Sequence, residues 1–179
     1  LFILAVGRLA ARKGNGFLLR SFAKVVESTD ANLVIIGRGS LRRKLISMAS
    51  RLGIGDRVSI ESSMNFQEVA EMYRAADLVV YPSYYEGQGL IPLEAMSSGT
   101  PVVTVNHGPL PEMVDETVGA LFEMGSMESF SEAIVSESSS ISALQEKGDR
   151  GRSRVMAKFT LENNANDFLD IYKRAISNS

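Results

Sequence analysis

The sequence predicts an α/β fold in which a doubly wound, Rossmann-like parallel sheet of about six strands has helices on both faces and a helical C-terminal end. Three observations support this prediction. Apolar segments of strand length alternate with amphipathic segments of helix length. The apolar segments are continuous, as is typical of strands that are buried on both faces of a sheet. Glycines and charged residues follow several of them, at the sheet edge where such folds bind their ligands.

Each predicted strand is a short apolar run, and the connections between them are expected to be right-handed crossovers. The six runs are Leu1–Val6, Asn32–Ile36, Val58–Glu61, Leu78–Tyr81, Pro101–Val105 and Gly119–Phe122.

Helices are predicted wherever apolar residues recur with helical periodicity. Between the strands these segments are Phe17–Glu27, Leu41–Leu52, Phe66–Ala75 and Leu90–Ser97. The C-terminal third adds Met127–Val135, Ile141–Lys158 and Leu161–Ile176, with a loop at Ser136–Ser140. The last helix carries an apolar stripe that includes Leu161, Phe168 and Tyr172, so we expect it to dock on another surface.

The amino-acid composition excludes several classes of function. The chain has 179 residues, of which 45% are hydrophobic and 22% charged, as in ordinary globular proteins. A net charge of -2 with no obviously basic face argues against a nucleic-acid partner. The absence of Cys excludes disulfides, thiolate metal sites and a cysteine nucleophile, and it fits a cytoplasmic location. The apolar run at Leu1–Val6 is far shorter than the roughly 18 residues that a membrane helix needs.

The most informative segment covers residues 84–103, with the sequence YYEGQGLIPLEAMSSGTPVV. Gly87 and Gly89 allow positive φ angles and a close approach to a ligand. The loop leads into a predicted helix, whose N-terminus offers free N–H groups and the positive end of the helix dipole. The segment therefore predicts an anion site. Glu86 and Glu94 add acceptor groups that suit sugar hydroxyls, and Glu86 is the stronger site candidate because a carboxylate in that loop stabilises no helix.

Arg8 and Lys13 follow the first predicted strand in the sequence GRLAARKG. Two cations in a glycine-bearing loop at the carboxyl end of a parallel strand suit a diphosphate. The alternative, a solvated basic loop, has about equal weight from the motif alone.

Other motifs are weaker. The GRGS sequence at residues 37–40 is not a dinucleotide fingerprint, because Arg42 stands where the third glycine is required, and a tight strand-to-helix turn is the simpler interpretation. His107 is the only histidine, and a lone His in a polar loop is more typical of a surface. No carboxylate pair is spaced to hold a divalent ion on a nucleotide, and Walker A and G-x-S-x-G patterns are absent.

Taken in order and spacing, GRLAARKG, GRGS, YYEGQGLIPLEAMSSGTPVV and HGPLPEMV resemble the C-terminal half of GT-B glycosyltransferases. The closest group is the retaining family 4, also called glycosyl transferases group 1. The resemblance runs from about Leu4 to Phe122, and the terminal helix around residues 159–176 also fits.

The resemblance implies a nucleotide-sugar site. Arg8 and Lys13 would hold the diphosphate, and Glu94 would bind the ribose hydroxyls. Glu86, with the backbone N–H groups that follow it, would bind the donor sugar and phosphate, and the segment Ser62–Met64 would lie near the base. The complete set of candidate donor-binding residues is Gly7, Arg8, Lys13, Gly37, Met64, Glu86, Gly87, Gln88, Gly89, Leu90 and Glu94, with Arg8, Lys13 and Glu86 also as candidate catalytic residues and no metal ligand.

The resemblance further implies that residues 1–179 are a single nucleotide-sugar-binding domain from a longer, two-domain chain. The expected donor is UDP- or GDP-linked, without a separate cofactor, and the expected reaction is a metal-independent, retaining hexosyl transfer. The acceptor, a sugar, lipid or protein glycan, would bind to the N-terminal domain, so the isolated domain is expected to be inactive. A cytoplasmic enzyme, free or peripheral on the cytoplasmic membrane face, fits this interpretation.

Departures from the family pattern affect specificity. Gln88 stands where many members have an aromatic residue, close to the expected donor sugar. Arg38 and Ser40 replace the more usual Asp and Pro on the base side.

Three alternatives stay open on sequence grounds. A GT-B sugar-nucleotide epimerase would use a similar site. A phosphorylase would need a pyridoxal-phosphate lysine, which no sequence signal identifies. A non-catalytic module, for nucleotide sensing or for scaffolding, would keep the fold without the chemistry.

Overall fold

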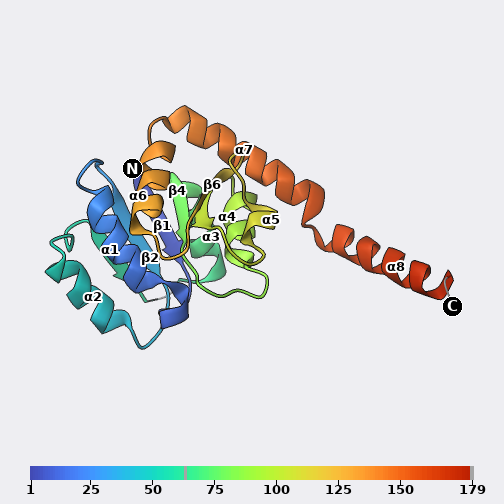
Figure 1. Ribbon diagram of the computed structural model, residues 1–179, viewed down its shortest axis with the longest axis horizontal. Helices are drawn as coiled ribbons and strands as arrows, with labels where there is room; N and C mark the ends of the chain where they lie inside the picture. Colours follow the sequence, from blue (N-terminus) through green and yellow to red (C-terminus); the bar gives the residue numbers. More distant parts are fainter. Residues whose placement is uncertain (63, 178–179) are drawn as a thin grey trace.

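The computed structural model describes residues 1–62 and 64–177 and confirms the predicted doubly wound sheet (Figure 1). Six parallel strands lie in the order β3-β2-β1-β4-β5-β6. Their bounds are β1 (Phe2–Val6), β2 (Asn32–Ile36), β3 (Val58–Glu61), β4 (Leu78–Tyr81), β5 (Val102–Val105) and β6 (Gly119–Phe122). The order reverses between β1 and β4, and ligands of such sheets bind beyond the carboxyl ends of the strands at this switch point.

Helices cover both faces of the sheet. One face is covered by α1 (Asn15–Val25), α2 (Arg42–Arg51) and α6 (Met127–Glu137). The other is covered by α3 (Phe66–Ala75), α4 (Leu90–Ser97), α5 (Leu110–Met113) and α7 (Ile141–Lys158). Successive strand residues alternate between the two cores: Ile3 lies in the first and Leu4 in the second, both with 0% exposure. This explains why the strands are continuously apolar in sequence.

The structure adds two short helices to the prediction. The 3₁₀ helix η1 (Ala11–Lys13) and the four-residue α5 are too short for periodicity to reveal. Gly14 ends η1 in a left-handed conformation, with a φ of 70°, and caps α1 directly. Helix α1 therefore begins at Asn15, two residues before the predicted start, and includes Gly16.

Helix α7 is fastened to the body of the domain by close packing and by an ion pair. A Cβ on Gly148 would lie 2.0 Å from the carbonyl oxygen of Gly99, so only glycine permits this approach. Further along the helix, Arg154 Nη2 donates to both carboxylate oxygens of Asp115, at 3.0 and 2.8 Å. Partial burial opposes ionisation of Asp115, but the hydrogen bonds from Arg154 and Thr117 outweigh it and lower its pKa to about 2.

Helix α8 (Leu161–Ser177) extends away from the rest of the domain (Figure 1). None of its described residues is buried, and its apolar stripe is open: Leu161 is 90% exposed and Phe168 is 56% exposed. The expectation that this stripe docks on a surface therefore stays a prediction. No helix among the residues that the structure describes is long and apolar enough to cross a bilayer.

The expectation that no face is basic is wrong, because the low net charge hides a strong separation of charge. Residues 1–57 hold eleven Lys and Arg against three Asp and Glu, whereas residues 58–179 hold eight against eighteen. Exposed cations gather on α1 and α2, which lie side by side at one end of the molecule (Figure 1). We define the basic face as Arg20, Lys24, Arg43, Lys44 and Arg51.

Replacing Asp115 with Asn tests the anchor of α7. The folded-state pKa of Asp115 is depressed, so its contribution to stability is present above its unfolded pKa of about 3.9 and is lost as the pH falls to about 2. We expect D115N to lower the free energy of unfolding by about 1 kcal/mol at neutral pH, since the pair is half-exposed. The difference should vanish once the pH falls below the folded pKa. Urea denaturation across this pH range measures it, and E146Q, which removes an exposed pair with Arg150, should show no such difference.

Candidate functional site

The loops that follow β1 and β4 meet at the switch point of the sheet. The backbone N–H of Tyr84 donates to the carbonyl oxygen of Arg12 at 2.9 Å. A Cβ on Gly14 would lie 2.0 Å from the carbonyl oxygen of Pro82. The two loops can therefore touch only because position 14 is a glycine, whose left-handed backbone also suits this residue type.

This contact builds a polar cluster around one oxygen of Glu86. Lys13 Nζ, the Tyr81 hydroxyl and Ser83 Oγ all donate to Glu86 Oε1, with the tyrosine bond at 2.6 Å. Lys13 Nζ also donates to the Tyr81 hydroxyl at 2.8 Å. The side chains of Lys13 and Glu86 are each 12% exposed, so their ion pair is shielded from water. The sequence predicts both residues at the site but not their contact with each other.

The charge states of the cluster follow from its geometry. Burial opposes ionisation of Glu86, but hydrogen bonds from Lys13, Ser83 and Tyr81 outweigh that effect and hold the pKa of the carboxyl below its usual range. Burial and the neighbouring Glu86 carboxylate raise the pKa of Tyr81, so its hydroxyl stays protonated and donates. Glu86 is thus a fixed carboxylate whose Oε1 already accepts three hydrogen bonds.

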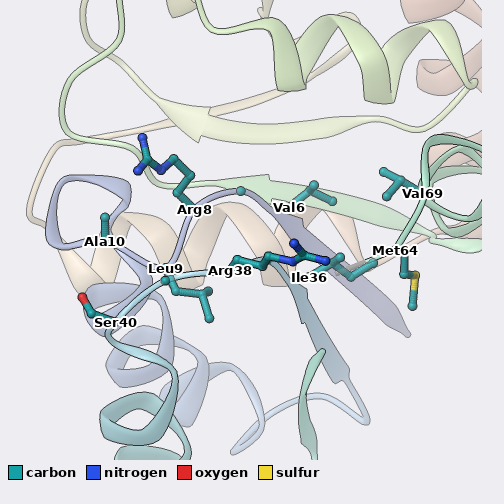
Figure 2. A pocket seen from close by; sticks show the side chains of 12 residues that line it. Val6, Arg8, Leu9, Ala10, Ile36, Arg38, Ser40, Met64 and Val69 are labelled. Carbon is teal, nitrogen blue, oxygen red and sulfur yellow. The ribbon is translucent and has the colours of Figure 1, made fainter. Parts of the chain in front are cut away.

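A cavity of about 530 Å³ lies between the loops after β1 and β2 and the start of α3 (Figure 2). Four of the predicted site residues line it: Gly7, Arg8, Gly37 and Met64. Figure 2 shows the Arg38 side chain lying along the cavity beside Ile36, while the Arg8 guanidinium points away from Arg38. Ser63, in the predicted base-side segment Ser62–Met64, lies outside the described residues.

The glycines of the GRGS sequence serve close backbone packing. A Cβ on Gly37 would lie 1.8 Å from the carbonyl oxygen of Gly7, and one on Gly39 would lie 2.3 Å from that of Leu9. The backbone N–H of Leu9 donates to the carbonyl oxygen of Arg38 at 2.9 Å. The loops after β1 and β2 are thus held against each other, and together they form one wall of the cavity.

Glu94 lies in a second cavity of about 300 Å³, which shares Val69 with the first. The Tyr73 hydroxyl donates to Glu94 Oε2 at 3.0 Å. Tyr73 is 3% exposed, and burial together with the Glu94 carboxylate raises its pKa, so it remains a donor. One oxygen of Glu94 is therefore fixed, in the same way as one oxygen of Glu86.

The residues between Glu86 and Glu94 agree only in part with their predicted roles. Gly89 has the predicted positive φ, at 81°, but the expectation of a positive φ at Gly87 is wrong. The N-terminus of α4 has no side-chain cap, as the predicted anion site requires. Gln88 and Leu90, however, line a separate hollow of about 460 Å³ beside the start of α8 instead of the cavity next to Arg8.

Sequence reasoning missed the side chains that orient the two glutamates. Tyr81 and Ser83 stand at the carboxyl end of an apolar strand, and hydroxyls at this position were the available signal. Tyr73 occupies an ordinary apolar position of α3 and gave no signal. His107 is exposed and lies outside the cluster. Within residues 1–62 and 64–177, no three His, Cys, Asp or Glu side chains are grouped to hold a metal ion.

The chain matches the family model of glycosyl transferases group 1 over residues 1–147. It is 32% identical over 177 residues to a D-inositol 3-phosphate glycosyltransferase of Segniliparus rotundus, an alignment that covers 96% of this chain and 39% of the relative. The chain spans less than half the length of the curated relatives it matches.

Two solved structures have the same fold. A sucrose-phosphate synthase from Thermosynechococcus elongatus superposes with a TM-score of 0.86 at 30% identity, covering 99% of this chain and 46% of that one. A mutant of S. aureus TarM, in complex with Fondaparinux, alpha-GlcNAc-glycerol and UDP, superposes with a TM-score of 0.87 at 25% identity, covering 96% and 35%.

Removing the Tyr81 hydroxyl tests the cluster. In Y81F, Glu86 loses one of three donors, so we expect its pKa to rise and the free energy of unfolding to fall by about 1–2 kcal/mol. Carboxyl NMR titration and urea denaturation measure the two effects. The matched control is Y84F, which removes a hydroxyl from a ring that packs edge-on against Phe17, outside the hydrogen bonds to Glu86. Equal effects in both variants would contradict the assigned role.

Proposed function

The chain belongs to the glycosyl transferases group 1 family, and from this premise we propose that it is the donor-binding domain of a retaining glycosyltransferase. It would bind a nucleotide-diphosphate sugar and present the sugar for metal-independent transfer of a hexosyl group. The observation that carries the proposal is the Lys13, Tyr81 and Glu86 cluster at the switch point of the sheet, together with a 530 Å³ cavity that Arg8, from the same loop as Lys13, lines. The presence of UDP in the similar TarM complex supports a nucleotide donor.

The leaving group of such a reaction is a diphosphate whose negative charge grows in the transition state. Preorganised cations and dipoles stabilise this charge where no metal does. Arg8 lines the large cavity, Lys13 lies 2.8 Å from the Tyr81 hydroxyl, and the N-terminus of α4 is uncapped. In the proposal, Arg8 and the α4 N–H groups bind the phosphates, and Lys13 Nζ reaches the diphosphate from its place on Glu86.

The two glutamates would bind hydroxyls. Glu86 Oε1 accepts three hydrogen bonds from protein donors, so Oε2 is the oxygen that a donor sugar would use. Tyr73 fixes Glu94 Oε2, which leaves Oε1 for the ribose. Each carboxylate is held before the ligand arrives, which lowers the entropic cost of binding.

The 530 Å³ cavity, on the side of Arg38 and Met64, would take the base. The Arg38 guanidinium can donate to the carbonyl oxygens of uracil or guanine, whereas adenine has no carbonyl oxygen and presents an amino donor beside its ring-nitrogen acceptors. This favours a UDP- or GDP-linked sugar over an ADP-linked one.

The acceptor would bind to another domain, with the open apolar stripe of α8 against it. The chain spans 39% of the relative from Segniliparus rotundus, and α8 carries exposed Leu161, Phe168 and Tyr172. An exposed apolar stripe of this kind is typical of an interaction surface.

Calorimetric titration with UDP, GDP, ADP and their common sugar conjugates tests the donor site, with magnesium and with a chelator. We expect one nucleotide to bind without metal, and R8A and K13A to weaken it about thirtyfold each, as for a lost charged hydrogen bond of about 2 kcal/mol. R51A, which removes an exposed cation far along α2, should bind normally. Absence of binding to any nucleotide by folded protein would contradict the proposal and favour a scaffolding module.

The same protein should not transfer sugar. If the acceptor site belongs to another domain, the 179 residues alone will neither hydrolyse nor transfer the sugar of a donor that they bind. Chromatography of the nucleotide products after prolonged incubation measures this. Turnover with added acceptor would overturn the assignment of the acceptor site to a separate domain.

A further inference from the structure

We propose that the basic face, on α1 and α2, is a docking surface for an anionic lipid bilayer. The inference goes beyond the proposed function, because the face lies on helices and is not made of the residues of the Glu86 cluster. It rests on the separation of charge in the chain and on the geometry of these two helices.

Four cations of the basic face lie along the contact between α1 and α2. A Cβ on Gly16 would lie 3.7 Å from Arg20 Nη1 and 3.9 Å from Met48 Cε, so the Arg20 guanidinium reaches the contact between α1 and α2. On α2, Lys44 and Arg51 stand about one turn on either side of Met48. Lys24 lies one turn beyond Arg20 on α1.

These cations are exposed and available. All five are exposed, and no ion pair within the described part of the chain involves any of them. By contrast, Arg42 and Arg57, which neighbour them in sequence, donate to Ile60 and Asp30 respectively. The basic face is therefore distinct from the cations that the fold itself uses.

Acidic residues are concentrated in the middle of the chain. Residues 58–137 carry thirteen Asp and Glu against one basic residue, whereas residues 138–179 carry five against seven. Helices α1 and α2 together hold six Lys and Arg and no Asp or Glu. A surface with one sign of charge attracts a partner of opposite charge through the field that it creates.

A bilayer fits this face better than a nucleic acid does. Clusters of four to eight Lys and Arg on an amphipathic helix are typical of binding to anionic lipid headgroups. Exposed aromatic rings, on which single-stranded bases stack, are absent from the described residues of α1 and α2.

Sedimentation with lipid vesicles tests the proposal. The chain is mixed with vesicles of phosphatidylcholine alone and with vesicles that contain an equal part of phosphatidylglycerol. We expect binding only to the anionic vesicles, with loss in molar salt, where the Debye length falls from about 10 Å to about 3 Å. Equal binding to both vesicles, or no binding to either, would overturn it.

A matched pair of variants locates the surface. The triple variant R20Q, K24Q, K44Q should weaken binding to anionic vesicles by about a hundredfold, since each basic residue near such a surface strengthens binding about fivefold. The control R74Q, R152Q, K158Q removes the same charge from exposed positions elsewhere, and it should bind nearly as wild type. Equal loss in both would show a net-charge effect and contradict a localised face.

Nucleic acid is the competing partner. Fluorescence anisotropy with a labelled duplex DNA and a labelled single-stranded RNA, at the salt concentration of the vesicle assay, compares the two. Tighter binding to either polymer than to anionic vesicles, with the same loss in the triple variant, would reassign the face to nucleic acid. Weaker binding to both supports the bilayer.

Discussion

The site depends on the close approach of three backbone loops at the carboxyl edge of the sheet. The loop after β1 lies between those after β2 and β4, and at Gly14, Gly37 and Gly39 a Cβ would lie within 2.3 Å of a carbonyl oxygen of the neighbouring loop. Such distances exclude any side chain without a shift of backbone. Because the loops touch, Lys13 from the first strand's loop reaches Glu86 from the fourth strand's loop, 73 residues away.

The close approach of these loops also explains how the shielded carboxylate of Glu86 is stabilised. A carboxylate that is largely withdrawn from water needs hydrogen bonds that offset its desolvation. Glu86, whose side chain is 12% exposed, has three donors on one oxygen, and the exposed Glu94 accepts from the Tyr73 hydroxyl. In both cases a buried tyrosine orients the carboxylate and leaves the other oxygen for a ligand. The fold thus fixes the acceptors of the site before binding.

Much of the fold followed from the sequence, because burial on both faces makes the strands continuously apolar and the helices amphipathic. All six strands and five of the seven predicted helices have the predicted ends within one residue at each terminus, and Arg8, Gly37 and Met64 do line one cavity. The features that the sequence did not predict depend on contacts between segments that are distant in the chain. The start of α1 depends on the packing of Asn15 and on Gly14, and the role of Tyr73 depends on a helix neighbour that no spacing reveals.

The uneven distribution of charge along the chain is not apparent from its net charge. The net charge of -2 is the small difference between a basic segment, residues 1–57, and an acidic remainder of the chain. Only the fold shows that α1 and α2 bring exposed cations of the basic segment together. The site needs some of that positive charge: Arg8 and Lys13 belong to the same basic segment. The cations of the basic face on α1 and α2 are not part of the site, because they belong neither to the hydrophobic core nor to the Glu86 cluster. Lysine and arginine that the fold leaves unpaired side by side repel one another, and a partner of opposite charge removes that cost. For this reason the proposal of an anionic partner depends on the grouping of these cations on one face, and not on any single Lys or Arg.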